Sequence, residues 1–365
     1  MYSTEQEFTK VILVRVDKDK EENDVFSELT DLAHTAGYLS VGTLTQRREK
    51  PDHTFYIGTG KVQELAEAIK ALDAEKVIFD NDVSPSQLNN LEKELKIPVI
   101  DRATLILEIF AAHATSNEGK LQVELAQKKH ALPRVLGQGM ILSRTGGGGG
   151  GGAGARRGGG EQQLELDRRT IREEIKDLER RLEKAAETRR LRRNKRNKTE
   201  IKSVCIVGYT NAGKSTLMNN LTKANVLEKD MLFATLDPVS RKMWLAPKKE
   251  FIITDTVGFI SRLPHEFIEA FKSTLEETTE ADLILLVCDV SDADFVQKYD
   301  VVKGVLKEIG ADNVPVLSVF NKTDKLTEKD ILPLDGVCIS AKTGKGIQEL
   351  KTEISQKLFG EKYEW

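Results

Sequence analysis

Short apolar runs alternate with amphipathic stretches along the first hundred residues. Two of these stretches, residues 61–72 and 84–96, have apolar side chains at helical spacing, and the second opens with a Ser-Pro pair that is typical of a helix start. Four short, apolar segments rich in β-branched residues indicate strands: 11–16, 38–44, 76–80 and 97–101. This alternation predicts a small α/β domain with a partly parallel sheet over residues 1–102.

The pattern becomes helical over residues 103–200, where strand signals disappear. Leucines recur at helical spacing between residues 117 and 143, and Pro133 predicts a kink or a break there. A second, highly charged stretch has a heptad-like apolar seam, formed by Leu164, Ile171, Ile175, Leu178, Leu182 and Ala185. We expect two long helices that pack as an antiparallel hairpin, with the glycine-rich residues 146–160 as a mobile tip.

Strand and helix patterns alternate again over residues 201–365. The expected strands are residues 203–208, 241–245, 250–255, 283–289, 315–321 and 337–340. Helical patterns lie between most of them, which predicts a third domain with a doubly wound, mostly parallel sheet.

Composition and charge narrow the function classes. The longest strongly apolar run, residues 283–288, is far too short to span a membrane, and the first residues lack the pattern of a secretory signal. We therefore expect a cytoplasmic protein, in which Cys205, Cys288 and Cys338 are small buried strand residues. The net charge is −3, but residues 120–200 alone carry +10, with the densest run at residues 189–198. A basic segment between two acidic ones favours a nucleic-acid partner.

The sequence GYTNAGKS, residues 208–215, fits the phosphate-binding pattern G-x-x-x-x-G-K-[ST]. It follows an expected strand and opens an expected helix, which is the context that such a loop requires. Small residues let backbone N–H groups close around phosphates. Lys214 supplies a cation to the β- and γ-phosphates, and Ser215 offers a hydroxyl to Mg²⁺.

Two motifs that follow the phosphate loop indicate a γ-phosphate sensor. Thr235, in FATLDP, can complete the Mg²⁺ shell from a mobile loop. In DTVG, Asp255 can hold Mg²⁺ through water, and the Gly258 N–H can meet the γ-phosphate.

Two later motifs indicate that the base is guanine. In NKTD, the Asp324 carboxylate can accept the N1–H and N2–H of guanine, a donor pair that adenine lacks. We expect Asp324 to be a buried carboxylate, which would reject adenine because adenine would leave it unpaired. The backbone of SAK, residues 340–342, can donate to guanine O6.

The five motifs together predict a GTP-hydrolysing enzyme with Mg²⁺ as cofactor. We expect Lys214, Thr235 and Gly258 to act in the reaction, and Ser215 and Thr235 to bind the metal. The residues expected to bind the nucleotide are Gly208, Tyr209, Thr210, Asn211, Ala212, Gly213, Lys214, Ser215, Thr216, Asp255, Thr256, Val257, Gly258, Asn321, Lys322, Asp324, Ser340, Ala341 and Lys342.

Residues 201–365 resemble a GTPase domain of the translation-factor-related class, and the whole chain resembles the HflX family. The closer resemblance rests on YIGTGKVQEL, on LSRTGGG before the basic glycine stretch, and on EQQLELDRRTIREEI. The family usually has Gly-Pro-Gly-Glu-Thr-Gln-Leu-Glu before its long helix, where this chain has Gly-Gly-Gly-Glu-Gln-Gln-Leu-Glu.

The resemblance implies a ribosome-associated GTPase that binds the large ribosomal subunit and its rRNA, and dissociates stalled or idle ribosomes. Its glycine-rich tip would reach toward the peptidyl transferase centre. An RNA-binding switch in subunit assembly or hibernation, gated by GTP, is an alternative, and a coiled-coil scaffold with a regulatory GTPase domain is another. We expect a monomer.

Two residues bear on the rate of hydrolysis. Phe259 follows DTVG, where many GTPases place a glutamine that orients the attacking water, so we expect slow intrinsic hydrolysis. Asn211 resembles the asparagine that helps related GTPases bind K⁺ beside the phosphates, which makes K⁺ a further candidate cofactor.

Overall fold

The computed structural model describes residues 8–18, 26–145, 157–197, 201–222, 232–233, 237–246, 249–262, 267, 271–326 and 335–361. The chain divides into two compact units. The first comprises residues 1–112 and 123–181, and the second comprises residues 113–122 and 182–365. The glycine-rich residues 146–156 lie outside the described residues, and helix α6 already begins at Arg157.

The first unit contains a four-stranded sheet with the order β2-β1-β3-β4, in which every pair of neighbours is parallel. Its strands are β1 (Thr9–Asp17), β2 (Tyr38–Arg47), β3 (Lys76–Phe79) and β4 (Val99–Asp101). The helices that connect or follow them are α1 (Ser27–Thr35), α2 (Thr59–Leu72), α3 (Pro85–Leu95) and α4 (Arg102–His113). The sequence prediction of a small α/β domain is therefore confirmed, and the sheet is fully parallel rather than partly so.

Side chains from both faces of strand β1 are buried. Ile12 and Val14 pack in one core with Leu65 of α2 and Leu91 of α3. Leu13, which points to the opposite face, is also fully buried. Burial on both faces explains the continuous apolar run that made this strand recognisable in the sequence.

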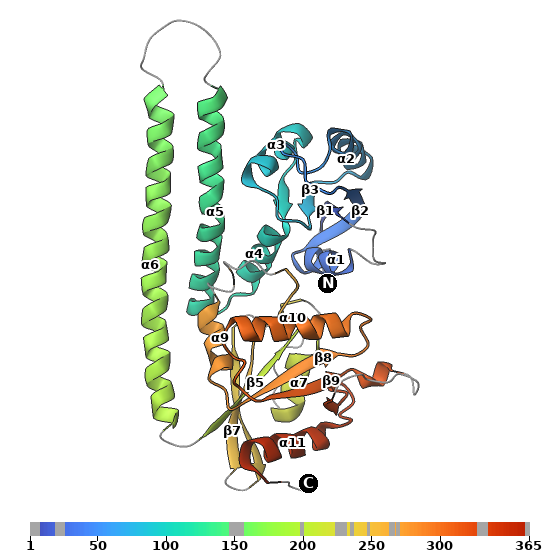
Figure 1. Cartoon of the computed structure of the whole chain (residues 1–365), viewed down its shortest axis with the longest axis vertical. Coiled ribbons are helices and arrows are strands. Elements are labelled where there is room, and N and C mark those ends of the chain that lie inside the picture. The colour runs from blue at the N-terminus through green and yellow to red at the C-terminus, as the bar shows by residue number, and fades with distance from the viewer. Residues whose placement is uncertain are drawn as a thin grey trace, which may run out of the picture. The chain divides into compact units, whose positions relative to one another are not determined.

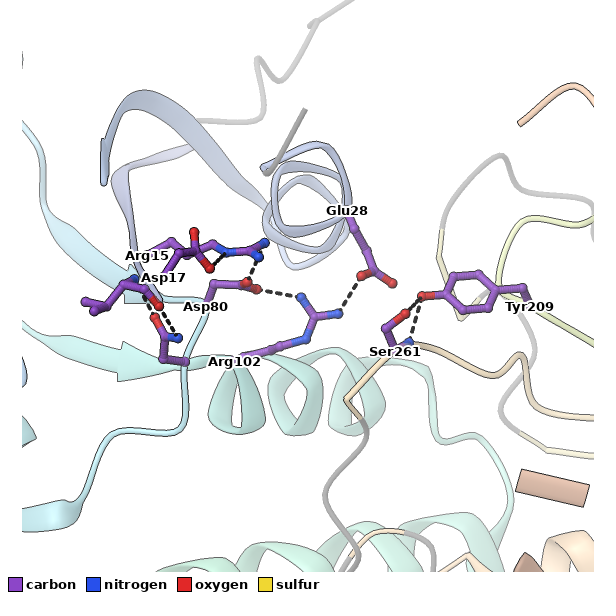
Figure 2. A network of polar contacts seen from close by, with 9 residues as sticks. Arg15, Asp17, Glu28, Asp80, Arg102, Tyr209 and Ser261 are labelled. Carbon is purple, nitrogen blue, oxygen red and sulfur yellow. Dashed lines mark hydrogen bonds and ion pairs between the residues drawn. The ribbon is translucent and has the colours of Figure 1, made fainter. Parts of the chain in front are cut away.

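A buried network of charged side chains lies at the carboxyl ends of β3 and β4 (Figure 2). Arg102, only 4% exposed, donates to Asp80 at 2.7 Å and to Glu28 at 2.8 Å. Arg15 pairs with the other oxygen of Asp80 at 3.4 Å. Because Asp80 faces two guanidinium groups, its loss would leave buried positive charge poorly compensated.

The long helices α5 (Asn117–Thr145) and α6 (Arg157–Asn197) run antiparallel, as predicted (Figure 1). Ion pairs connect them in opposite order along the two helices: Lys128 with Glu174 at 2.7 Å, Lys129 with Glu179 at 3.1 Å, and Glu118 with Arg189. Leu178 and Leu182 of the predicted apolar seam are buried. Helix α5 continues through Pro133, so the predicted kink does not split it.

The second unit contains a six-stranded sheet with the order β10-β9-β8-β5-β7-β6. Its strands are β5 (Lys202–Gly208), β6 (Val239–Ala246), β7 (Lys249–Asp255), β8 (Leu283–Asp289), β9 (Val316–Asn321) and β10 (Val337–Cys338). Only the β6–β7 pair is antiparallel among the strands described here, which confirms the mostly parallel prediction.

Four helices of the second unit are α7 (Lys214–Thr222), α9 (Lys272–Thr279), α10 (Phe295–Glu308) and α11 (Ile347–Phe359), with a short 3₁₀ turn at Thr323–Lys325. Leu217 of α7 and Leu350 of α11 pack on one face of the sheet in the core around Ile206 and Leu285. Cys205 and Cys288 are buried as expected, but Cys338 is exposed. Cys338 lies on β10 at the edge of the sheet, where one face of the short strand remains uncovered.

Replacing Asp80 with alanine tests the buried network. We expect the first unit to lose about 3–5 kcal/mol of stability, because the variant leaves buried charge uncompensated. Hydrogen exchange at the β3 and β4 amides would measure this loss. Asp73→Ala is the matched control, since Asp73 forms a solvent-exposed ion pair with Lys10. Equal effects of the two substitutions would contradict the assignment.

Candidate functional site

Four of the sequence motifs meet at one edge of the second unit's sheet. GYTNAGKS ends and follows β5, DTVG ends and follows β7, NKTD ends and follows β9, and SAK begins two residues after the end of β10. These strands are parallel, so their carboxyl ends share one edge, where open α/β sheets bind ligands. Thr235, from the fifth motif, lies outside the described residues.

The phosphate loop requires glycine at two positions. A Cβ atom on Gly208 would lie 2.2 Å from the backbone oxygen of Val287 on the neighbouring strand β8. At Gly213, φ is +87°, and a Cβ atom would lie 2.3 Å from the side-chain nitrogen of Asn321. The pattern found in the sequence therefore has a steric cause at both of its glycines.

Lys214 is the buried cation of the loop. It begins helix α7 and is 7% exposed, and its ammonium group donates to the backbone oxygens of Tyr209 at 2.8 Å and Gly208 at 3.2 Å. Burial lowers the pKa of Lys214 to about 8, although the nearby charge of Asp255 opposes this shift. Phosphate groups placed against this side chain would favour its charged form, so the loop is electrostatically suited to an anion.

Ser215 and Asp255 form the pair that fits a divalent cation. The Ser215 hydroxyl donates to the Asp255 carboxylate at 2.8 Å, and Asp255 is fully buried. Hydroxyl and carboxylate oxygens are the hard metal ligands that Mg²⁺ prefers. Mg²⁺ sites that also bind phosphates use few protein ligands. The residues present therefore fit Mg²⁺. The next residue, Thr256, is buried, and its hydroxyl donates to the Ile206 backbone oxygen at 2.7 Å, which fixes the start of DTVG on β5.

Gly258 lies directly against the phosphate loop. A Cβ atom there would lie 2.9 Å from the Lys214 ammonium nitrogen and 3.0 Å from the Thr210 Cα atom. The lack of space for a Cβ atom shows that the Gly258 backbone lies beside Lys214 and Thr210, which are expected to meet the phosphates.

Phe259 extends the backbone pairing between the same two segments. Its N–H donates to the Gly208 oxygen at 3.0 Å, and its carbonyl accepts from the Thr210 N–H at 2.8 Å. The Phe259 side chain is buried, at 4% exposure, so it is a packing residue rather than one that faces solvent at the phosphate loop.

A second bond between the loop and the segment after DTVG was not predicted from the sequence. The Tyr209 hydroxyl lies 2.7 Å from the Ser261 hydroxyl and accepts from the Ser261 N–H at 2.6 Å (Figure 2). Tyr209 stands at a variable position of the phosphate-loop pattern, so the pattern does not predict which residue its hydroxyl contacts. It holds the chain beyond Gly258 against Tyr209.

Asn321 joins the phosphate loop to the SAK segment. Its side-chain nitrogen donates to the Ala212 oxygen at 2.9 Å, and its side-chain oxygen accepts from the Ala341 N–H at 2.8 Å. Asn321 is only 2% exposed. From the other side, Asn220 of α7 donates to the Ala341 oxygen at 2.6 Å. The segments expected to meet the phosphates and the base are thus held in register by two side-chain amides, of which Asn321 is buried and Asn220 is exposed.

Asp324 accepts a hydrogen bond from the Ser340 hydroxyl at 2.6 Å, and this bond holds the pKa of the Asp324 carboxyl below its usual value. The prediction that Asp324 is buried is wrong, because Asp324 lies exposed on the short 3₁₀ turn. Its position is instead fixed by Ser340, which is fully buried. Lys322, also in this motif, pairs with Asp289 at 2.6 Å.

Three family models match successive parts of the chain. They are described as GTP-binding GTPase N-terminal over residues 23–111, GTP-binding GTPase middle region over residues 113–196, and 50S ribosome-binding GTPase over residues 203–322. Together they follow the order of the N-terminal sheet, the helical region and the nucleotide site.

Curated relatives are similar over nearly the whole chain. GTPase HflX of Caldanaerobacter subterraneus subsp. tengcongensis is 47% identical, covering 96% of this chain and 81% of that protein. GTPase HflX of Escherichia coli K12 is 42% identical, covering 94% and 81%. Among solved structures, the complex of SsGBP with GDP superposes with a TM-score of 0.51 at 26% identity, covering 95% of this chain and 98% of that one.

Asn321→Ala tests whether the buried amide organises the site. We expect at least a tenfold loss of guanine-nucleotide affinity, because two buried hydrogen bonds of about 1 kcal/mol each are removed and their partners are left unsatisfied. Titration with a fluorescent GDP analogue would measure the loss. Asn90→Ala is the control, since Asn90 also donates to a backbone oxygen but belongs to the first unit, which contains none of these motifs. Unchanged affinity in Asn321→Ala would contradict the assigned role.

Proposed function

Because this chain belongs to the HflX family of GTPases, we propose that its GTP hydrolysis controls binding to the large ribosomal subunit and the dissociation of stalled or idle ribosomes. The family model that covers the nucleotide site is described as a 50S ribosome-binding GTPase, which supports this partner. The protein would act as a monomer in the cytoplasm. No helix among the described residues is long and apolar enough to cross a membrane.

The observation that carries the proposal is the charge of the helical region. Residues 120–200 carry a net +10, on a chain whose total is −3. Several arginines of α6 are well exposed, including Arg169 and Arg180, and their partners are exposed neighbours on the same helix. Such surface pairs contribute little energy, so phosphates can compete for these guanidinium groups. This charge favours rRNA over a purely protein partner.

In the proposed reaction the chain positions the nucleotide and stabilises charge. Backbone N–H groups of residues 208–216 bind the phosphates, Lys214 neutralises the β- and γ-phosphates, and the Gly258 N–H meets the γ-phosphate. Ser215 and Thr235 would hold Mg²⁺, with Asp255 as a further contact, and the ion would supply further charge neutralisation at the phosphates. Asn211, in the left-handed conformation at φ +59°, is the candidate K⁺ contact.

The residue that follows DTVG is unsuited to orienting the attacking water. Phe259 stands where many GTPases have a glutamine, and its side chain is buried. We therefore propose slow intrinsic hydrolysis that the ribosome accelerates.

Sedimentation of purified ribosomes tests this function. We expect separate subunits when ribosomes are mixed with the protein and either GTP or a non-hydrolysable analogue, and joined ribosomes with GDP. Lys214→Ala should fail with every nucleotide, because the phosphates lose their buried cation. Ribosomes that stay joined with both GTP and the analogue would refute dissociation.

The same experiment separates the main alternative, a GTP-gated RNA-binding switch in subunit assembly or hibernation. Under that alternative, the protein would co-sediment with subunits or ribosomes in GTP without separating them. GTP turnover that large subunits leave unchanged would contradict both ribosomal functions.

Asp324→Asn tests the proposed base recognition. The amide presents a donor where guanine N2–H needs an acceptor, so we expect a large loss of GTP affinity and a gain for xanthosine triphosphate, which has an oxygen at that position. Competition titrations with the two nucleotides would measure the exchange. If Asp324→Asn keeps full GTP affinity, Asp324 does not read the base.

A further inference from the structure

A carboxylate just before strand β6 binds the start of the long helix α5. Asp237 comes two residues after Thr235 in the chain. One of its oxygens accepts from the Thr115 N–H at 2.9 Å, the Thr115 hydroxyl at 2.6 Å and the Ser116 N–H at 2.7 Å. The other accepts from the Ser116 hydroxyl. All of these residues belong to the second compact unit.

The contact completes the cap of α5 from a distant part of the sequence. The Ser116 hydroxyl accepts from the Gly119 N–H at 2.8 Å, which is the ordinary bond of an N-cap serine. Asp237 then satisfies the donors just before the helix and places negative charge at its positive end. A cap that only stabilised the helix could come from an adjacent residue, whereas Asp237 is more than a hundred residues away.

Gly119 shows that this close approach is built into the helix. A Cβ atom on Gly119 would lie 2.3 Å from an Asp237 carboxylate oxygen. Gly119 is not among the residues with positive φ, so its backbone conformation does not require glycine. Glycine in a helix costs about 1 kcal/mol relative to alanine. Room for the Asp237 carboxylate is therefore the physical reason for glycine at this position.

The first turn of α5 also contacts the basic part of α6. Glu118 forms an ion pair with Arg189, at the start of the dense basic run 189–198. A short series of polar contacts thus leads from Asp237, through the first turn of α5, to the residues best suited to bind RNA phosphates.

We propose that Asp237 is a positioning residue that couples the nucleotide state to the helical hairpin. The inference rests on the proposed function, in which GTP and Mg²⁺ engage Thr235. Engagement of Thr235 fixes the Asp237 backbone two residues away, so the carboxylate holds the first turn of α5. Release of Thr235 after hydrolysis frees Asp237, and the hold on α5 weakens. The hairpin thereby responds to GTP through a contact that does not touch the nucleotide.

Hydrogen exchange on the full chain without ribosomes tests this coupling. In wild-type protein with Mg²⁺, we expect the amides of residues 115–120 to exchange about fivefold more slowly with a non-hydrolysable GTP analogue than with GDP. A fivefold change corresponds to the free energy of about one hydrogen bond. Equal exchange in the two states would overturn the proposal.

Gly119→Ala breaks the contact from the helix side, far from the phosphate loop in sequence. We expect it to keep GDP affinity and basal GTP hydrolysis at saturating GTP within about twofold, and to lose the nucleotide dependence of exchange. Because coupling is reciprocal, its affinity for the GTP analogue should fall by no more than about fivefold. Gly304→Ala is the matched control, because Gly304 lies inside helix α10 and a Cβ atom there meets nothing within 4 Å. It should retain the full dependence. Persistence of that dependence in Gly119→Ala would refute the role of Asp237.

A second measurement separates this inference from the proposed function. Gly119→Ala should lose ribosome dissociation while Gly304→Ala retains it. If wild-type protein shows nucleotide-dependent exchange but never separates ribosomes, the proposed function fails and the coupling stands. If Gly119→Ala dissociates ribosomes as well as wild type, the coupling fails and the function stands.

Discussion

The buried amide of Asn321 is the interaction on which the nucleotide site depends. It donates to the phosphate loop at Ala212 and accepts from Ala341, so the segments that would meet the phosphates and the base cannot move independently. The close contact between Asn321 and Gly213 ties the loop's conformation to the same side chain. Around this centre, Thr256 and Phe259 fasten DTVG to β5 and the phosphate loop by backbone-directed hydrogen bonds. The site is therefore preorganised by polar contacts between strand ends, and its chemistry needs little further movement apart from the loops that sense the terminal phosphate.

That movement must reach the basic helices if hydrolysis is to control an RNA partner. The Thr235 loop lies close in sequence to Asp237, whose carboxylate gathers four hydrogen bonds at the start of α5. A dense set of short polar contacts of this kind is either made or lost, and it does not stretch gradually. A two-state switch needs such all-or-none contacts, because they let the presence or absence of the terminal phosphate change the structure elsewhere in the chain.

The sequence was sufficient for the elements and the motifs, because both rest on local patterns. The buried strands of both sheets are continuous apolar runs. The phosphate loop requires its two glycines because a Cβ atom at either position would lie within 2.3 Å of a neighbouring atom. The long-range polar contacts could not be predicted. Nothing near Asp237, Tyr209 or Arg102 in the sequence identifies Ser116, Ser261 or Asp80 as partners, since a single polar residue has no periodicity. Cys338 was misjudged for a related reason: its strand has only two residues and lies at the sheet edge.

The central proposal is that the nucleotide at the second unit's sheet controls how Asp237 holds the start of the helical hairpin. A direct measurement is the distance distribution between spin labels at Lys176→Cys on α6 and Gln356→Cys on α11, both exposed, with the exposed Cys338 replaced by serine. The account predicts two different distributions for protein loaded with GDP and with a non-hydrolysable GTP analogue in the presence of Mg²⁺. Superimposable distributions in the two states would contradict it.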